Sequence, residues 1–128
     1  MKIMVFQWCD FLDIAQYLYS QGKMNTIPQE AAYRSAIGRA YYAAYCHSRE
    51  YAISKLQFQP DMDDPVKDHT RLRIHLYKRG CPKEAKYLDD MRQWRNNCDY
   101  KNITFDASEI TVTKSIEKAK NIASSLHL

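Results

Sequence analysis

The sequence predicts an all-α protein, an up-and-down bundle of four to five helices with a long central second helix. Three observations favour this fold class. Apolar residues recur at steps of three and four along most of the chain, as one buried face of a helix requires. Proline, glycine and capping residues divide these periodic stretches into segments with short connections. No stretch shows the convincing apolar and polar alternation that a strand would have.

The central helix is predicted from the stretch RSAIGRAYYAAYCHSREY at residues 34–51. Small residues there let neighbouring helices approach closely, while tyrosine rings fill volume and keep a hydroxyl for a polar partner. Thr26 and Gln29 form a capping-box pattern with Pro28 in the first turn, so the helix should begin there and continue to about Phe58. Function is expected among the polar residues that interrupt this packing, which are Arg34, Arg39, His47, Arg49 and Glu50.

Two further helices flank the central one in the sequence. Residues 5–21 form an amphipathic pattern that Gly22 should end. A cap-then-proline signal at Pro65 opens another helix over residues 64–78, and Gly80 should close it. The apolar side chains available for burial in this third helix are Val66, Leu72, Ile74, Leu76 and Tyr77.

The last two helices carry regular apolar steps. Pro82 starts the fourth helix, whose buried stripe is predicted to bring Arg95 beside the core face. Its apolar positions are Ala85, Leu88, Met91, Trp94 and Cys98. Asp106 with Glu109 is a second capping-box pattern and should open the final helix. That helix has the most regular amphipathic pattern in the chain, with Val112, Ile116, Ala119, Ala123 and Leu126 in its stripe.

Length and composition suit one helical domain over residues 1–128. Hydrophobic residues make up 45% and charged residues 27% of the chain, a balance that argues against disorder. The net charge of +4 favours an anionic partner, although two oppositely charged, solvated faces would give the same value. The apolar run at the start is too short for a signal or membrane-spanning segment, so a cytoplasmic protein without membrane contact is expected.

Metal and nucleophile chemistry find little support in the sequence. The four cysteines lie far apart without a Cys-x-x-Cys pair, and His69 and His75 are six residues apart, so they do not share a helix face. Asp63, Asp64 and Asp68 could hold a divalent ion, but carboxylates at a helix N-terminus also interact with its dipole. No serine or cysteine lies in a recognisable nucleophile elbow. Neither a metal nor a cofactor is therefore expected.

The segment MRQWRNNCDY, residues 91–100, brings several polar groups together near a helix end. Arg95 and Asp99 are i, i+4 neighbours, and Arg92 has the same relation to Asn96. An arginine can bind a phosphate with paired donors, an asparagine can orient it, and a tyrosine such as Tyr100 can stack on a base. The same spacing also suits an ordinary exposed salt bridge near a helix C-terminus.

Three blocks in the chain resemble the HEPN (higher eukaryotes and prokaryotes nucleotide-binding) superfamily, most closely its small stand-alone bacterial and archaeal proteins. The blocks are RAYYAAYCH at residues 39–47, Asp68-His69 at the head of a helix, and WRNNCDY at residues 94–100. They occur in the family's order, and the resemblance extends from about Tyr33 to the last helix.

The resemblance implies a helical bundle that commonly dimerises, with the Arg-Asn blocks of two subunits facing a shared cleft. Many HEPN proteins are metal-independent endoribonucleases, often toxins paired with a nucleotidyltransferase-type antitoxin, in which an arginine and a following histidine act on RNA. Arg95 and Asn96 match the start of that motif, whereas Asp99-Tyr100 stands in place of the histidine. His69 or His47 would then have to supply the proton from another helix.

Two hypotheses follow from the resemblance. The first is an RNA-acting dimer in a toxin–antitoxin or defence setting, and the second is a non-catalytic HEPN module that binds a nucleotide, RNA or a partner protein. The predicted catalytic residues are Arg95, Asn96, Asp99, Tyr100 and His69. The predicted RNA-binding residues are Arg39, Arg92, Arg71 and Arg73.

Overall fold

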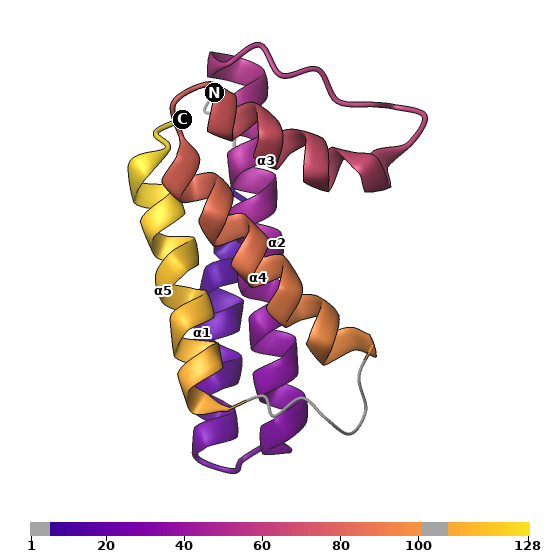
Figure 1. The fold of residues 1–128 in the computed structure, drawn as a ribbon. Helices are drawn as coiled ribbons and strands as arrows, with labels where there is room; N and C mark the ends of the chain where they lie inside the picture. The colour runs from indigo at the N-terminus through magenta and orange to yellow at the C-terminus, as the bar shows by residue number, and fades with distance from the viewer. Residues whose placement is uncertain (1–5, 101–107) are drawn as a thin grey trace.

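The computed structural model of this chain describes residues 6–100 and 108–128, and of residues 99 and 100 it describes the backbone alone. The described residues contain helices and no strand, which confirms the all-α fold class (Figure 1). The elements in chain order are α1 (Asp10–Lys23), α2 (Gln29–Lys55), the short 3-10 helix η1 (Pro65–Lys67), α3 (Asp68–Lys78), α4 (Pro82–Tyr100) and α5 (Glu109–Ser125).

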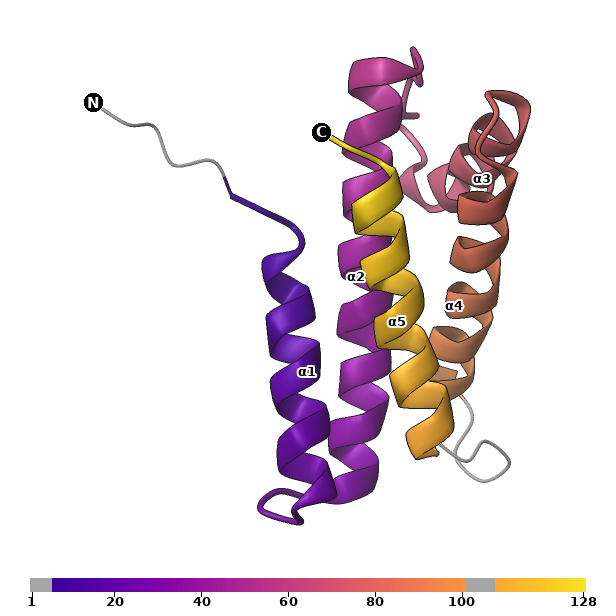
Figure 2. The ribbon, with the colours of Figure 1, turned by 90° about the vertical axis from the view of Figure 1, so that its left-hand side faces the viewer.

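Helix α2 is the centre of the bundle, because α1, α3, α4 and α5 all contact it. Figure 2 shows α1, α2 and α5 as neighbouring long helices, with α4 beside them and α3 near one end. Most of the alanines and tyrosines of α2 are buried, as its mixture of small and aromatic residues predicts. An exposed strip of α2 remains at Ser35, Arg39 and Tyr42.

The connection between α1 and α2 differs from the expected one. Gly22 lies inside α1, and the left-handed turn after the helix falls on Asn25, whose φ is 59°. Pro28 precedes α2 without a side-chain cap, so the expected capping box is wrong. Thr26 instead donates a 3.0 Å hydrogen bond to the backbone oxygen of Gln21, while Gln29 donates a 3.2 Å bond to that of Gly22. These side chains satisfy the last carbonyls of α1.

Gly22→Ala is expected to destabilise the protein, whereas Gly38→Ala should stabilise it. A Cβ at Gly22 would lie 2.8 Å from Ala32 Cβ and 3.2 Å from Tyr33 Cε1, so α1 and α2 would have to move apart at a cost of about 1–3 kcal/mol. Nothing lies within 4 Å of a Cβ placed at Gly38, where alanine should add about 0.4–1 kcal/mol by restricting the unfolded chain. Urea unfolding measures both changes, and stability shifts of the same sign would contradict this close helix approach.

The connection between α2 and α3 begins earlier than expected. Helix α2 ends at Lys55, and Gln57 follows with a positive φ of 55°. Phe58, the expected last residue of the helix, is a buried loop residue. In α3, Leu72 and Leu76 are buried as predicted, while Val66, Ile74 and Tyr77 are exposed. Gly80, with a φ of 89°, comes directly after the residue that caps α3, as expected.

The remaining helices follow their apolar patterns closely. Helix α1 starts at Asp10, later than expected, and the expected start at Val5 lies outside the described residues. Ala85, Leu88, Met91 and Cys98 of α4 are buried, as are Val112, Ile116, Ala119 and Leu126 at α5. Helix α5 is capped by Ser108, whose hydroxyl accepts from Thr111 N, and Asp106 lies outside the described residues. No described helix has the length and apolar character needed to cross a membrane.

Candidate functional site

Three stacked aromatic rings form the middle of the candidate site. Tyr41 and Tyr45 are one turn apart on α2, and His69 is the second residue of α3. The centre of the His69 ring lies 4.0 Å from the centre of the Tyr45 ring, and the two planes make an angle of 12°. It lies 5.7 Å from the centre of the Tyr41 ring, at an angle of 18°. The Tyr41 hydroxyl is also hydrogen bonded to Nδ1 of His69 at 2.5 Å. Helix α2 therefore fixes both the plane and the position of the imidazole.

Buried Asp68 holds the start of α3 in place. Its carboxylate accepts hydrogen bonds of 3.0 and 3.2 Å from the backbone N–H of Asp61 and pairs with Arg71 at 2.6 Å. Arg71 also donates to the backbone oxygen of Gln59 at 2.9 Å and lies 5.4 Å from the ring of Phe58. These contacts connect the α2–α3 loop to the first turn of α3, and thereby position His69.

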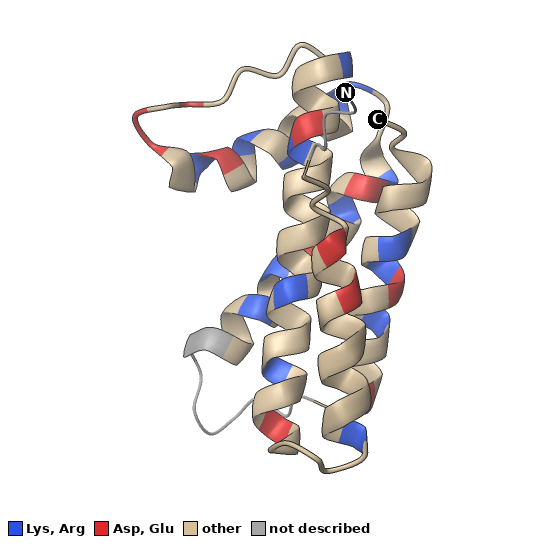
Figure 3. Cartoon of the chain, turned by 180° about the vertical axis from the view of Figure 1, so that it is seen from behind, with Lys and Arg blue, Asp and Glu red and all other residues tan. Residues whose placement is uncertain are grey.

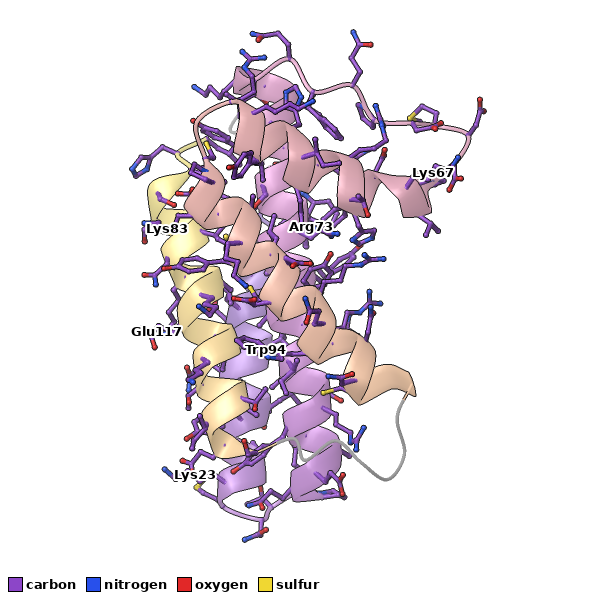
Figure 4. All side chains as sticks on the ribbon, viewed as in Figure 1. Lys23, Lys67, Arg73, Lys83, Trp94 and Glu117 are labelled. Carbon is purple, nitrogen blue, oxygen red and sulfur yellow. The ribbon has the colours of Figure 1, made fainter. Side chains whose placement is uncertain are left out.

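Three arginines approach this aromatic stack, and we call Arg73, Arg92 and Arg95 the arginine cluster. The Arg95 guanidinium carbon lies 5.7 Å from the centre of the Tyr41 ring. Arg73, labelled in Figure 4, donates to the backbone oxygen of His69 at 3.2 Å and lies 3.7 Å from a carboxylate oxygen of Asp89. Among the described residues, Arg92 has no hydrogen-bond or ion-pair partner. Positive charge from α3 and α4 thus gathers around one imidazole.

The arginine cluster and the burial of His69 keep this imidazole uncharged at neutral pH. Burial is the largest cause, and together with the charges of Arg92, Arg95 and Arg73 it lowers the pKa of His69 to about 4. Burial also raises the pKa of the Tyr41 phenol well above its ordinary value. The hydrogen-bonded pair of Tyr41 and His69 is therefore neutral while the surrounding guanidinium groups are charged.

The free energy of unfolding should fall as the pH falls from about 6.5 to about 4 because of His69. In this range the unfolded histidine is protonated, whereas the folded one, with a pKa of about 4, is not. Acid therefore favours the unfolded state, which binds more protons, and above this range neither state carries the extra proton. Urea unfolding of wild type and His69→Gln measures the effect: wild type should lose stability more steeply toward acid. A difference between them that does not change with pH would contradict the lowered pKa.

A pocket of about 280 Å³ opens beside the aromatic stack, between α2 and the start of α3. We call it the α2–α3 pocket. Its walls combine aromatic rings with charged groups, namely Trp8, Tyr45, Arg49, Glu50, Asp68 and His69. Trp8 Nε1 donates a 2.8 Å hydrogen bond to Glu50, which fixes the orientation of that carboxylate. His69 belongs both to this pocket and to the surroundings of the arginine cluster.

The structure brings together four of the predicted site residues, which are His69, Arg73, Arg92 and Arg95. Asn96 follows Arg95 on α4 and is half-buried. The side chains of Asp99 and Tyr100, predicted as catalytic, lie outside the described residues.

Two predicted RNA-binding residues have other surroundings. Arg39 lies 5.6 Å from the ring of Phe11, on the side of α2 next to α1. Arg71 binds Asp68 and the α2–α3 loop. Figure 3 shows basic segments on α4 near those of α2, while acidic segments gather in the loop before α3. That loop uses its carboxylates locally: Asp61 accepts from the backbone N–H of Asp63 and of Asp64 at 2.9 and 3.1 Å.

His47, considered above as a proton donor, has a structural position instead. Its Nε2–H donates a 2.6 Å hydrogen bond to the backbone oxygen of Leu126, just after α5, and its Nδ1 lies 3.6 Å from Cys9 Sγ. His75 likewise donates to the backbone oxygen of Leu56 at 2.6 Å. Both rings satisfy carbonyl groups near the C-terminal ends of helices.

The sequence did not identify Tyr41, Tyr45 and Arg49 as members of one site with His69. The i, i+4 spacing of the two tyrosines, continued four residues later by Arg49, was the available signal. It predicts a shared face of α2. It does not predict that the start of α3 meets this face.

Comparison with known proteins finds a similar archaeal chain, and the name of that protein does not state a function. The chain is 31% identical, over an alignment 131 positions long, to the uncharacterized protein MJ0992 of Methanocaldococcus jannaschii. The alignment covers 88% of this chain and 68% of the archaeal protein. No protein family model matches the chain, and no solved structure matches it.

Proposed function

The chain belongs to the same family as the archaeal protein MJ0992, and from the geometry of the site we propose that it is a HEPN-like protein acting on RNA. One observation carries this proposal: arginines of α3 and α4 lie against a histidine and the α2 tyrosines on which it stacks. Arg73 donates to the His69 backbone oxygen, Arg95 lies over the Tyr41 ring, and both, with Arg92, lower the pKa of His69. Cationic groups next to stacked aromatic rings suit single-stranded RNA, which offers both phosphates and bases.

The charge balance of the arginine cluster supports a phosphate as its ligand. Asp89 is the acidic partner of Arg73, at a separation of 3.7 Å, and its carboxylate is half exposed to water. Arg92 has no ion-pair partner among the residues that the structure describes. Guanidinium groups bind phosphate oxygens with paired, charge-assisted hydrogen bonds, and one phosphate could accept from two arginines. An anion would thus lower the repulsion among the three arginines.

Metal-independent cleavage is the finer form of this proposal, with His69 as the base: it is unprotonated at neutral pH, and a phosphate at the arginine cluster would raise its pKa from about 4 toward the range in which a base is efficient. The role as base requires the tautomer in which Nδ1–H donates to the Tyr41 oxygen, because Nε2 of His69 is then an acceptor for the proton of an RNA 2′-hydroxyl. The 2′-oxygen bonds to the adjacent phosphorus, the bond to the 5′-oxygen breaks, and the 5′-oxygen takes a proton from water. The hydroxide that remains accepts the proton that His69 took from the 2′-hydroxyl, which restores the base and the water. The arginine cluster would stabilise the negative charge that develops on the phosphate oxygens.

A non-catalytic module is the alternative, favoured by the Asp99-Tyr100 sequence where HEPN nucleases have a histidine. Such a module would bind RNA, a nucleotide or a partner protein with the same arginines. A homodimer, a nucleotidyltransferase-type antitoxin as partner, a toxin–antitoxin or defence role and a cytoplasmic location belong to the proposal as expectations of the HEPN resemblance.

RNA binding in buffer that contains a chelator tests the proposal directly. A fluorescently labelled single-stranded RNA should bind the full chain, and the logarithm of the association constant should fall linearly with the logarithm of salt concentration. Fluorescence anisotropy measures this dependence. Absence of binding at low salt would overturn the proposed function.

A further inference from the structure

The α2–α3 pocket has the size and lining of a site for one small, flat, polar molecule. Its volume of about 280 Å³ is near the lower end of the range of ligand pockets, which is roughly 300–1,000 Å³. Its aromatic walls are Trp8 and the stacked pair of Tyr45 and His69, whose ring centres are 4.0 Å apart, so a ligand could contact this pair only from outside the stack. A planar ring could therefore find apolar contact there, while Arg49 and Glu50 offer a donor and an acceptor.

The hydrogen-bonding capacity that remains in the pocket decides which ring fits. Asp68 is buried, and its carboxylate is used within the protein to accept from Asp61 N–H and Arg71. Glu50 has one oxygen bonded to Trp8 Nε1 and keeps its second oxygen. Arg49 has no hydrogen bond or ion pair to another described residue. The pocket thus offers a fixed carboxylate and a guanidinium group among its lining side chains.

Resting on the proposed action on RNA, we infer that the α2–α3 pocket binds a guanine base whose phosphate lies at the arginine cluster. Guanine combines a pair of adjacent donors, N1–H and the N2 amino group, with the acceptors O6 and N7. A carboxylate matches the donors and an arginine matches the acceptors, which is the common arginine contact with guanine. Adenine lacks N1–H, and uracil has one N–H donor and no amino group. His69 lines the pocket next to the arginines, so base and phosphate sites adjoin.

The test compares guanosine, inosine and uridine 5′-monophosphates by calorimetric titration of the full chain. Inosine monophosphate lacks only the N2 amino group, so it should bind about tenfold more weakly than guanosine monophosphate, and uridine monophosphate more weakly still. Glu50→Gln keeps an oxygen to accept from Trp8 while removing the negative charge, and should abolish most of the preference for guanosine over inosine. Glu117→Gln, on the exposed face of α5, is the matched control and should leave the preference unchanged.

Inorganic pyrophosphate and a uridine-only RNA separate failure of this inference from failure of the proposed function. If both bind while the three nucleotides bind equally, the guanine site is wrong and phosphate binding at the arginine cluster stands. If neither these probes nor the nucleotides bind, both proposals are wrong. A guanosine preference that persists in Glu50→Gln, with circular dichroism showing a folded variant, would also overturn the assigned role of Glu50.

Discussion

Replacing Arg92 and Arg95 together by alanine is expected to weaken RNA binding about 100-fold or more. Each arginine would lose charge-assisted hydrogen bonds to phosphate, which contribute about 1.5–3 kcal/mol each. The slope of log affinity against log salt should also decrease by about 1.4, because about 0.7 counterion is released for each phosphate contact on a single strand. Fluorescence anisotropy with a labelled single-stranded RNA at several salt concentrations measures both effects.

The matched control for this double variant is Lys114→Ala with Lys120→Ala, which removes the same positive charge from exposed positions of α5. It should change RNA affinity and the salt slope much less, because neither lysine lines the α2–α3 pocket or is among the charges that act on His69. Circular dichroism should show both double variants folded, since the contact of Arg95 with the Tyr41 ring is worth about 1 kcal/mol. Equal losses of affinity in the two double variants would contradict a phosphate site at the arginine cluster, because they would show that these arginines attract RNA only through their overall charge.

The sequence predicted the helices well, because each helix buries one face and its apolar residues therefore recur at steps of three and four. Apolar spacing located α4 and α5, and Pro82 marked where α4 begins. The errors fall at helix ends, where tertiary contacts decide. Gly22 has the usual signature of a helix end, yet its missing Cβ instead lets α1 approach Ala32 at the start of α2. No local pattern distinguishes a glycine that ends a helix from one that permits such an approach.

Only part of the site could be predicted from the sequence, and the two arginines of α3 show the reason. Arg71 and Arg73 are two residues apart, so their side chains leave the helix about 200° from each other. Arg71 therefore turns to Asp68 and the preceding loop, while Arg73 turns to α4 and Asp89. The spacing in the sequence predicts that the two arginines lie on opposite faces of α3, but it does not predict which of these faces contacts α4. The lowered pKa of His69 was equally out of reach, because its burial and its arginine neighbours come from three different helices.

His69→Gln is expected to lower metal-independent RNA cleavage by about 10²–10⁴-fold, the usual contribution of a positioned general base, while RNA affinity changes little. Gel analysis of a labelled RNA under single-turnover conditions, in chelator-containing buffer, measures the rate. His127→Gln is the matched control: His127 is exposed near the end of the chain and is the first histidine after the Arg95 motif. This variant should cleave at the wild-type rate.

The pH profile of cleavage distinguishes a base in this environment from an ordinary histidine. A base must be unprotonated, and the pKa of His69 is lowered to about 4 by burial and by Arg92, Arg95 and Arg73. At RNA concentrations well below the dissociation constant the rate reports the pKa of the free protein, so it should already be independent of pH from about 6 to 8, whereas a histidine with its usual pKa of about 6.5 would give a rate that rises across that range. A wild-type rate that rises through pH 6.5 would contradict the role of His69 as base. Binding of RNA without any cleavage would favour the non-catalytic module, in which the same uncharged ring serves only to stack.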